Sequence, residues 1–269
     1  MIKFLYLLLH LLMVVLLTVT TQVGGLCYVA VLVLRSVLHL KKMTSLLAFL
    51  LIYGGFSWLI VPILSPVFGR VPLPVAGTLR PLNIMTCALN RHYVTPQLKR
   101  QLAEVARKMN DGFPGTDVNY LDANFPFFIG FPLFPHLSHD DGKKVDLAFF
   151  FTEKATGERS AGNPSFIGYG AFDAPLGDEV NYPEKCSSQG FAMYNMLDFM
   201  RIFIDDDKYE VDVERTTYLI RMLAKDPATS KIFIEPHLKT RWNLKQYKKI
   251  RFQGCHSVRH DDHIHSQVF

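Results

Sequence analysis

The sequence predicts an α+β domain, a small antiparallel sheet with flanking helices, preceded by transmembrane helices. Three observations support this fold class. Apolar residues make up 49% of the 269 residues and are concentrated in the first quarter of the chain. Two later segments carry apolar residues at helical spacing, and several short apolar segments between and after them have the composition of strands. Helices segregated from a small sheet are typical of α+β domains.

Residues 1–68 are predicted to be a transmembrane anchor of two or three helices. From Ile2 to Leu34 the only charged residue is Lys3, and the run from Thr44 to Phe68 carries none. Each run exceeds the roughly 20 residues that span a bilayer, and both exceed the roughly 7 to 15 residues of a signal-peptide core. We expect Thr18–Gly25 to break the first run into a hairpin; one long tilted helix is the alternative.

The basic loop between the two runs predicts the orientation of the chain. Arg35, Lys41 and Lys42 lie in this loop, and short loops rich in Lys and Arg remain in the cytoplasm. The next helix therefore carries the rest of the chain to the extracytoplasmic side. The net charge of +5 is modest, and no cluster of Lys and Arg interleaved with aromatic residues indicates a nucleic-acid partner.

Residues 69–81 are predicted to be a Pro/Gly-rich linker, and residues 82–269 a single extracytoplasmic domain. The stretch from Pro62 to Pro81 holds five prolines and little pattern. In the domain, Pro96 at a first helical position and the turn at Asp226-Pro227 delimit two helices. The expected helices begin at Thr95 and Asp212, and the expected strands are Val118–Tyr120, Val145–Phe151, Ile232–Ile234 and Ile264–Val268.

Two histidine-rich segments predict one zinc site. His139 and Asp146 are separated by six residues that include Gly142, and a glycine turn allows both side chains to face one ion. Near the C-terminus, His263 and His265 lie two residues apart and would project from the same face of a strand. Three ligands of the His, Asp, His type leave a fourth zinc position open, as in catalytic sites.

These segments resemble the zinc peptidases of the lysostaphin, D-Ala-D-Ala carboxypeptidase and hedgehog type. Ser138–Asp146 (SHDDGKKVD) is similar to their S-H-x-x-G-x-x-x-D block, and HDDHIH at 260–265 to their closing H-x-H block. The penicillin-insensitive murein endopeptidase branch also has histidines at the positions of His136 and His260. The resemblance extends from about Asn124 to Val268.

The resemblance implies Zn²⁺ on His139, Asp146 and His265, with His136 nearby. It also implies hydrolysis of an amide bond in peptidoglycan peptides that contain D-amino acids, at the bacterial inner membrane with the domain in the periplasm. Asp262 and His263 are equal candidates for the general base. His136, His260 or His263 would stabilise the oxyanion.

Two further questions remain open at the level of sequence. Hedgehog-like domains indicate an alternative function, a non-catalytic zinc-containing binding or signalling module of the same fold. Cys186 and Cys255 lie in the predicted extracytoplasmic domain, and their spacing leaves open whether they form a disulfide.

Overall fold

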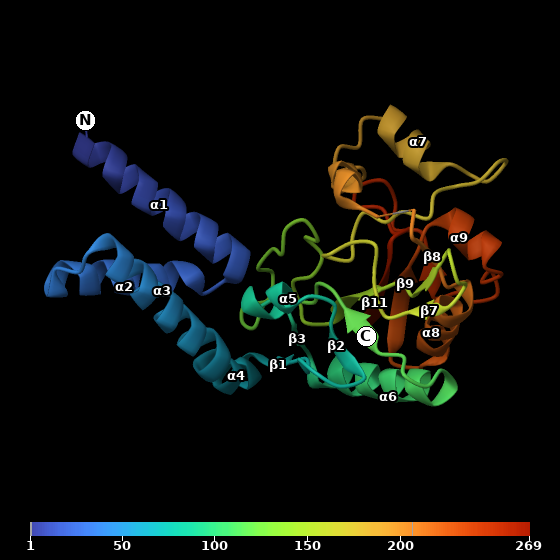
Figure 1. The fold of residues 1–269 in the computed structure, drawn as a ribbon, viewed down its shortest axis with the longest axis horizontal. Helices are drawn as coiled ribbons and strands as arrows, with labels where there is room; N and C mark the ends of the chain where they lie inside the picture. Colours follow the sequence, from blue (N-terminus) through green and yellow to red (C-terminus); the bar gives the residue numbers. More distant parts are fainter. Residues whose placement is uncertain (1, 206) are drawn as a thin grey trace.

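The chain begins with three apolar helices in the computed structural model, which describes residues 2–205 and 207–269 (Figure 1). They are α1 (Ile2–Thr21), α2 (Gly24–Leu38) and a long helix built from α3 (Lys42–Gly55), the π turn η1 (Phe56–Ile60), α4 (Val61–Leu64) and the 3₁₀ turn η2 (Ser65–Phe68). The expected break in the first apolar run is confirmed, because α1 and α2 separate at Gln22 and Val23 and pack against each other.

The residues at this break explain the tight hairpin. Gln22 adopts a left-handed conformation with φ 67°, and the backbone N–H of Gly24 donates to Thr21 Oγ1 at 2.8 Å. A Cβ atom on Gly25 would lie 2.0 Å from Thr18 Oγ1. Only glycine at position 25 therefore allows the two helices to approach this closely.

Two of these helices are long and apolar enough to cross a membrane, judged by length and composition. They run from Lys3 to Thr21 and from Lys42 to Phe68, and only 6% and 11% of the residues in their most apolar windows are buried. A core helix of a soluble protein would be mostly buried, whereas these helices direct their leucines outward. Helix α2, at 15 residues, is shorter than a full span.

A six-stranded mixed sheet forms the centre of the remaining chain. Its strands are β2 (Leu79–Pro81), β4 (Val118–Tyr120), β5 (Lys144–Ala148), β9 (Thr229–Phe233), β10 (Ile250–Arg251) and β11 (His263–Val268). The spatial order is β10-β9-β11-β5-β4-β2. The predicted antiparallel pairing holds for the four central strands, but it is wrong at both edges, where β10 pairs with β9 and β2 with β4 in parallel.

Alternation along the central strands separates the core from a polar face. Helices α6 (Pro96–Gly112) and α8 (Val213–Lys225) supply Leu102 and Leu219 to the core, which also contains Leu147 and Ile264 from the strands. Successive side chains of a strand point to opposite faces. Asp146 and His265 therefore project from the face opposite to these helices.

The predicted linker is instead part of the folded domain. Strand β1 (Val71–Pro72) pairs with β3 (Tyr93–Val94), and β2 lies in the main sheet. Arg70 is buried, and its Nη2 donates to the carbonyl oxygen of Asp140 at 2.7 Å. Prolines are tolerated here because these strands are short or lie at a sheet edge.

The domain packs directly against the helices. Asn90 Nδ2 donates to Ser57 Oγ at 3.0 Å, and Tyr53 OH donates to the carbonyl oxygen of Ala88, the last residue of α5 (Ile84–Ala88), at 2.6 Å. The N–H of Phe127 donates to Gln22 Oε1 at 2.9 Å. These contacts hold one side of the domain against the break between α1 and α2 and against the middle of the long helix, and Figure 1 shows this side facing the helices.

A disulfide between Cys186 and Cys255 joins two segments around the polar face. The remaining elements are β6 (Phe151–Glu153), β7 (Arg159–Ser160), α7 (Tyr182–Ser188), η3 (Asp198–Phe203), β8 (Tyr209–Val211) and α9 (Pro236–Arg241). Cys186 lies in α7, and Cys255 precedes the histidine-rich segment that leads into β11. The structure thus shows that Cys186 and Cys255 pair, which the sequence left open. Such bonds form and persist in oxidising compartments.

Candidate metal centre

Two neighbouring strands and the loop before one of them bring the predicted ligands together. Strands β5 and β11 are antiparallel, and His265 lies directly opposite Asp146 in their register. Opposite residues in an antiparallel pair project from the same face. His139 belongs to the loop that precedes β5, and this loop folds back over the same face.

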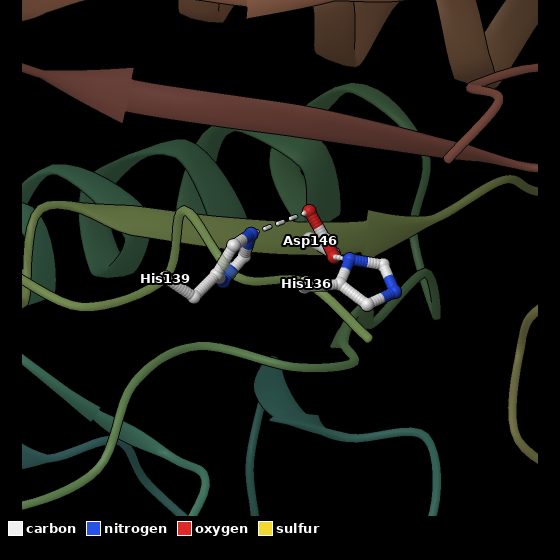
Figure 2. Close-up of side chains that lie close together, drawn as sticks. All are labelled: His136, His139 and Asp146. Atoms are coloured by element: carbon white, nitrogen blue, oxygen red, sulfur yellow. Dashed lines mark ion pairs between the residues drawn. The ribbon is translucent and has the colours of Figure 1, made fainter. Parts of the chain in front are cut away.

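His136, His139 and Asp146 are buried and lie close enough together to hold a metal ion. Figure 2 shows the two imidazoles on either side of the carboxylate. His136 Nδ1 lies 2.7 Å from Asp146 Oδ2, and His139 Nε2 lies 3.3 Å from Asp146 Oδ1. The two carboxylate oxygens of Asp146 thus face different histidines.

His265 lies on the Oδ1 side of Asp146, next to His139. Its Nδ1 lies 2.9 Å from Asp146 Oδ1 and 3.0 Å from His139 Nε2. Around a tetrahedral zinc ion with bonds of about 2.0–2.1 Å, ligand atoms are separated by about 3.3 Å. The atoms His139 Nε2, Asp146 Oδ1 and His265 Nδ1 are therefore almost as close to one another as ligands of a single ion.

Hydrogen bonds outside this group orient two of these side chains. His139 Nδ1 donates to the carbonyl oxygen of Ala123 at 2.6 Å, which leaves the lone pair on Nε2. Asp146 Oδ2 accepts from His136 Nδ1 and, at 2.9 Å, from Tyr169 OH. His139 and Asp146 therefore each present one atom to the cluster while the other polar atom is held in place.

The protonation states of two ligand candidates, Asp146 and His265, favour metal binding. Burial alone would raise the pKa of Asp146, but the imidazoles of His139, His136 and His263 hold it well below its usual value. Burial lowers the pKa of His265 to about 4, against the opposing effect of Asp146. The site thus presents an ionised carboxylate and a neutral imidazole, the forms that bind metals.

Burial and the carboxylates of Asp122 and Asp146 raise the pKa of Tyr169 well above its usual value, so the Tyr169 hydroxyl remains a hydrogen-bond donor.

His263 and Asp262 take different positions. His263 Nδ1 lies 2.5 Å from Asp262 Oδ1, and Asp262 Oδ2 accepts from the backbone N–H of Gly170 at 2.6 Å. His263 Nε2 lies 3.7 Å from Asp146 Oδ2 and has no hydrogen-bond partner in the described part of the chain. Burial lowers the pKa of His263, but Asp262 and Asp146 raise it more. Asp262 therefore orients His263, and His263 alone of the two faces the cluster.

Gly170 is required for this arrangement. It has φ 93°, and a Cβ atom there would lie 2.9 Å from Cβ of Met200. A larger residue would move the N–H that holds Asp262.

His260 is the remaining predicted residue, and it lies beside the cluster. Its ring centroid is 4.7 Å from that of His263 and 5.6 Å from that of His265. Burial, with the neighbouring His263 and His265, holds its pKa well below the usual value, so the ring is neutral. Its Nδ1 is buried and lacks a hydrogen-bond partner among the described residues.

A cavity of about 250 Å³ gives access to these groups. His136, His260 and His265 form part of its wall, together with Leu137 and Met193. His136 Nε2, His263 Nε2 and His265 Nε2 are also buried without a partner in the described ranges. Buried polar atoms without partners are rare, so their concentration here indicates a place where a polar molecule is bound.

The structure adds residues to the site that sequence reasoning missed. Tyr169 and Ala123 hold Asp146 and His139, and no local pattern marks either of them. Asp261, between two predicted residues, is instead bound by Arg259 through two hydrogen bonds of 2.7 and 2.6 Å. It therefore serves the packing of the segment and does not face the cluster.

Glu235 behind the site predicts a pH-dependent stability. Burial, with the nearby Asp261, raises its pKa to about 7. When the pKa of a carboxyl is higher in the folded than in the unfolded state, the folded protein loses stability as pH rises through that range. For Glu235 the free energy of unfolding falls by about 3 kcal/mol at most between pH of about 4.5 and about 7. We expect Glu235→Gln to reduce the loss of thermal stability between pH 5 and pH 8. Melting of the detergent-solubilised chain in chelator checks this; an unchanged difference between the two pH values would contradict it.

Searches against protein-family models and against curated proteins found no match to this chain. The function is therefore inferred from the geometry of these side chains and from the resemblance of the two motifs.

Proposed function

We propose that this chain is a membrane-anchored zinc metallopeptidase that hydrolyses an amide bond in peptidoglycan peptides containing D-amino acids. The observation that carries the proposal is the mutual approach of three donor atoms, His139 Nε2, Asp146 Oδ1 and His265 Nδ1, within 2.9–3.3 Å. Two imidazoles and one carboxylate are a ligand set that suits zinc and leaves a position open for chemistry.

The side chains around these atoms fit the roles of amide hydrolysis. Zinc held by His139, Asp146 and His265 would supply activation of water and polarisation of the scissile carbonyl. His263 accepts the proton of the attacking water at Nε2, and Asp262 holds the imidazole through Nδ1. His260, neutral and at the cavity wall, donates to the oxyanion that develops at the carbonyl.

The substrate class rests on the motifs. The S-H-x-x-G-x-x-x-D block and the closing H-x-H block fall on residues that lie together in one buried cluster, which supports the resemblance to murein endopeptidases and D-Ala-D-Ala carboxypeptidases. His136 and His260, the two further histidines of the endopeptidase branch, also line the cavity. We therefore favour peptidoglycan peptides over other amides.

The proposed location is the bacterial inner membrane, with the domain in the periplasm. Helices α1 and α3 to η2 have the length and outward-facing leucines of membrane spans. Arg35, Lys41 and Lys42 lie at the ends of the helices opposite to the domain, where the cytoplasmic side would be. The disulfide between Cys186 and Cys255 fits an oxidising compartment for the domain.

Hydrolysis is tested on purified sacculi with the full chain in detergent. We expect soluble muropeptide fragments to be released by the zinc-loaded protein, to stop after treatment with chelator and to resume on addition of zinc. His39→Ala, at an exposed position between α2 and α3, should act as the parent does. Stoichiometric zinc without any fragment or terminal D-amino acid released would reject the peptidase and favour the zinc-containing binding module.

A further inference from the structure

Several large apolar side chains are exposed on segments of the domain that lie close to the helices. Six of them, each between 49% and 78% exposed, form what we call the apolar rim: Ile84, Met85, Phe128, Ile129, Phe134 and Phe166. Single exposed apolar residues are common on protein surfaces, but a group on one side marks an interaction surface.

Contacts place the rim next to the helices. The Phe128 ring lies 5.6 Å from that of Phe68, the last residue of the long helix. Helix α5 begins with Ile84 and Met85 and ends at Ala88, which is bonded to Tyr53 of α3. In Figure 1, α5 lies on the side of the domain that faces the helices.

Of the three remaining rim residues, Ile129 follows Phe128 directly, and Phe134 and Phe166 belong to segments joined to the same region. The carbonyl oxygen of Phe134 accepts from Arg91 Nη2 at 2.5 Å, and Arg91 follows Asn90, which is bonded to Ser57. The carbonyl oxygen of Phe166 accepts from Asn83 Nδ2 at 3.2 Å, immediately before α5. The segments that carry Phe134 and Phe166 are thus joined to the segments that contact the helices.

We propose that the apolar rim is immersed in the membrane leaflet from which the domain emerges. The proposal rests on membrane anchoring by the helices and does not depend on hydrolysis. Continuity with the helices selects this occupant: Phe68 ends the apolar span, and Arg70 two residues later is already buried in the domain. Because no free linker separates span and domain, and Tyr53 and Ser57 within the span bond to the domain, the rim lies beside the C-terminal half of the long helix.

Immersion brings the candidate metal centre close to the membrane surface. Pro135, His136 and Leu137 follow Phe134 directly and form one wall of the cavity. One wall of the cavity therefore follows directly in sequence from the rim residue Phe134.

The test measures the depth of tryptophans placed on the rim. The full chain is reconstituted into phosphatidylethanolamine and phosphatidylglycerol vesicles with or without lipids brominated in their acyl chains. Ile129→Trp and Phe166→Trp lie on different segments of the rim. The control is Val213→Trp, an exposed position in α8, which lies on the far side of the domain from the helices (Figure 1). The parent emission, including that of Trp58, is subtracted.

We expect the added rim tryptophans to emit at shorter wavelength than the tryptophan at position 213, and to lose emission to brominated lipid while resisting aqueous acrylamide. Equal quenching by acrylamide at the rim and control positions, with no effect of brominated lipid, would overturn the proposal. Protection from both quenchers would also overturn it, because it would show a protein partner or a second copy on the rim. Either rim variant is decisive alone if the other fails to fold.

Discussion

Replacement of His265 by alanine is expected to lower zinc affinity more than 100-fold and to abolish hydrolysis. The reason is that His265 Nδ1 lies within 3.0 Å of both Asp146 Oδ1 and His139 Nε2, so its loss leaves two of the three proposed ligands. Loss of a residue that merely orients a ligand costs about 10- to 100-fold in metal affinity, and loss of a ligand costs more. Zinc content after dialysis at fixed free zinc measures the effect.

His136→Ala provides the sharpest comparison, because His136 belongs to the other group of side chains close enough to hold an ion. If His136 acts through Asp146 Oδ2, its loss should weaken zinc binding by only about 10- to 100-fold. The reverse order, with His265→Ala retaining zinc and His136→Ala losing it, would assign the metal to His136, His139 and Asp146.

His256→Ala serves as the matched control for both variants. His256 also lines the cavity, but its ring packs against Phe191, 4.6 Å away, and lies outside the cluster. Its loss should leave zinc content unchanged. Circular dichroism of all three variants separates loss of ligand from loss of fold.

Much of the site could be predicted because its residues follow local rules. Strand alternation alone places His263 and His265 on one face, and β11 has this alternation. The hairpin break at Gln22 and the helix starts at Pro96 and Val213 also follow from local preferences of Gly, Pro and capping residues.

The parts that could not be predicted depend on long-range contacts. Tyr169 reaches Asp146 across 23 residues of chain, and no periodicity marks it. Strand β2 was hidden in a proline-rich stretch, because an edge strand of three residues needs few ladder hydrogen bonds and tolerates Pro81. Parallel pairing at the sheet edges depends on the path of the chain that connects the paired strands, and the residues of a short strand do not determine this path.

Geometry favours His263 over Asp262 as the proposed general base, where sequence left the two residues equal. Asp262 precedes β11 and uses both carboxylate oxygens, one for His263 and one for Gly170. The sequence alone does not show which of two adjacent candidates, here Asp262 and His263, acts as the general base. Only the directions of their polar atoms separate a base from the residue that orients it.

Replacement of His263 by glutamine is therefore expected to lower kcat by about 10²- to 10⁴-fold, the usual contribution of a general base, while zinc content stays at the parent level. Asp262→Asn keeps the shape of the side chain and should cost much less, because its role is to hold His263 Nδ1 at 2.5 Å. Hydrolysis of a soluble muropeptide, measured beside zinc content for both variants, gives the comparison.

The variant with the larger loss of kcat identifies the general base. If Asp262 were the base, Asp262→Asn would show the larger loss of kcat and His263→Gln the smaller one. Equal losses with full zinc content would mean that proton transfer needs the pair as a unit, as in a carboxylate-histidine couple whose single deletions are not additive. Because Asp262 is already bonded to Gly170 and His263 Nε2 faces Asp146 at 3.7 Å, we expect the histidine variant to lose more.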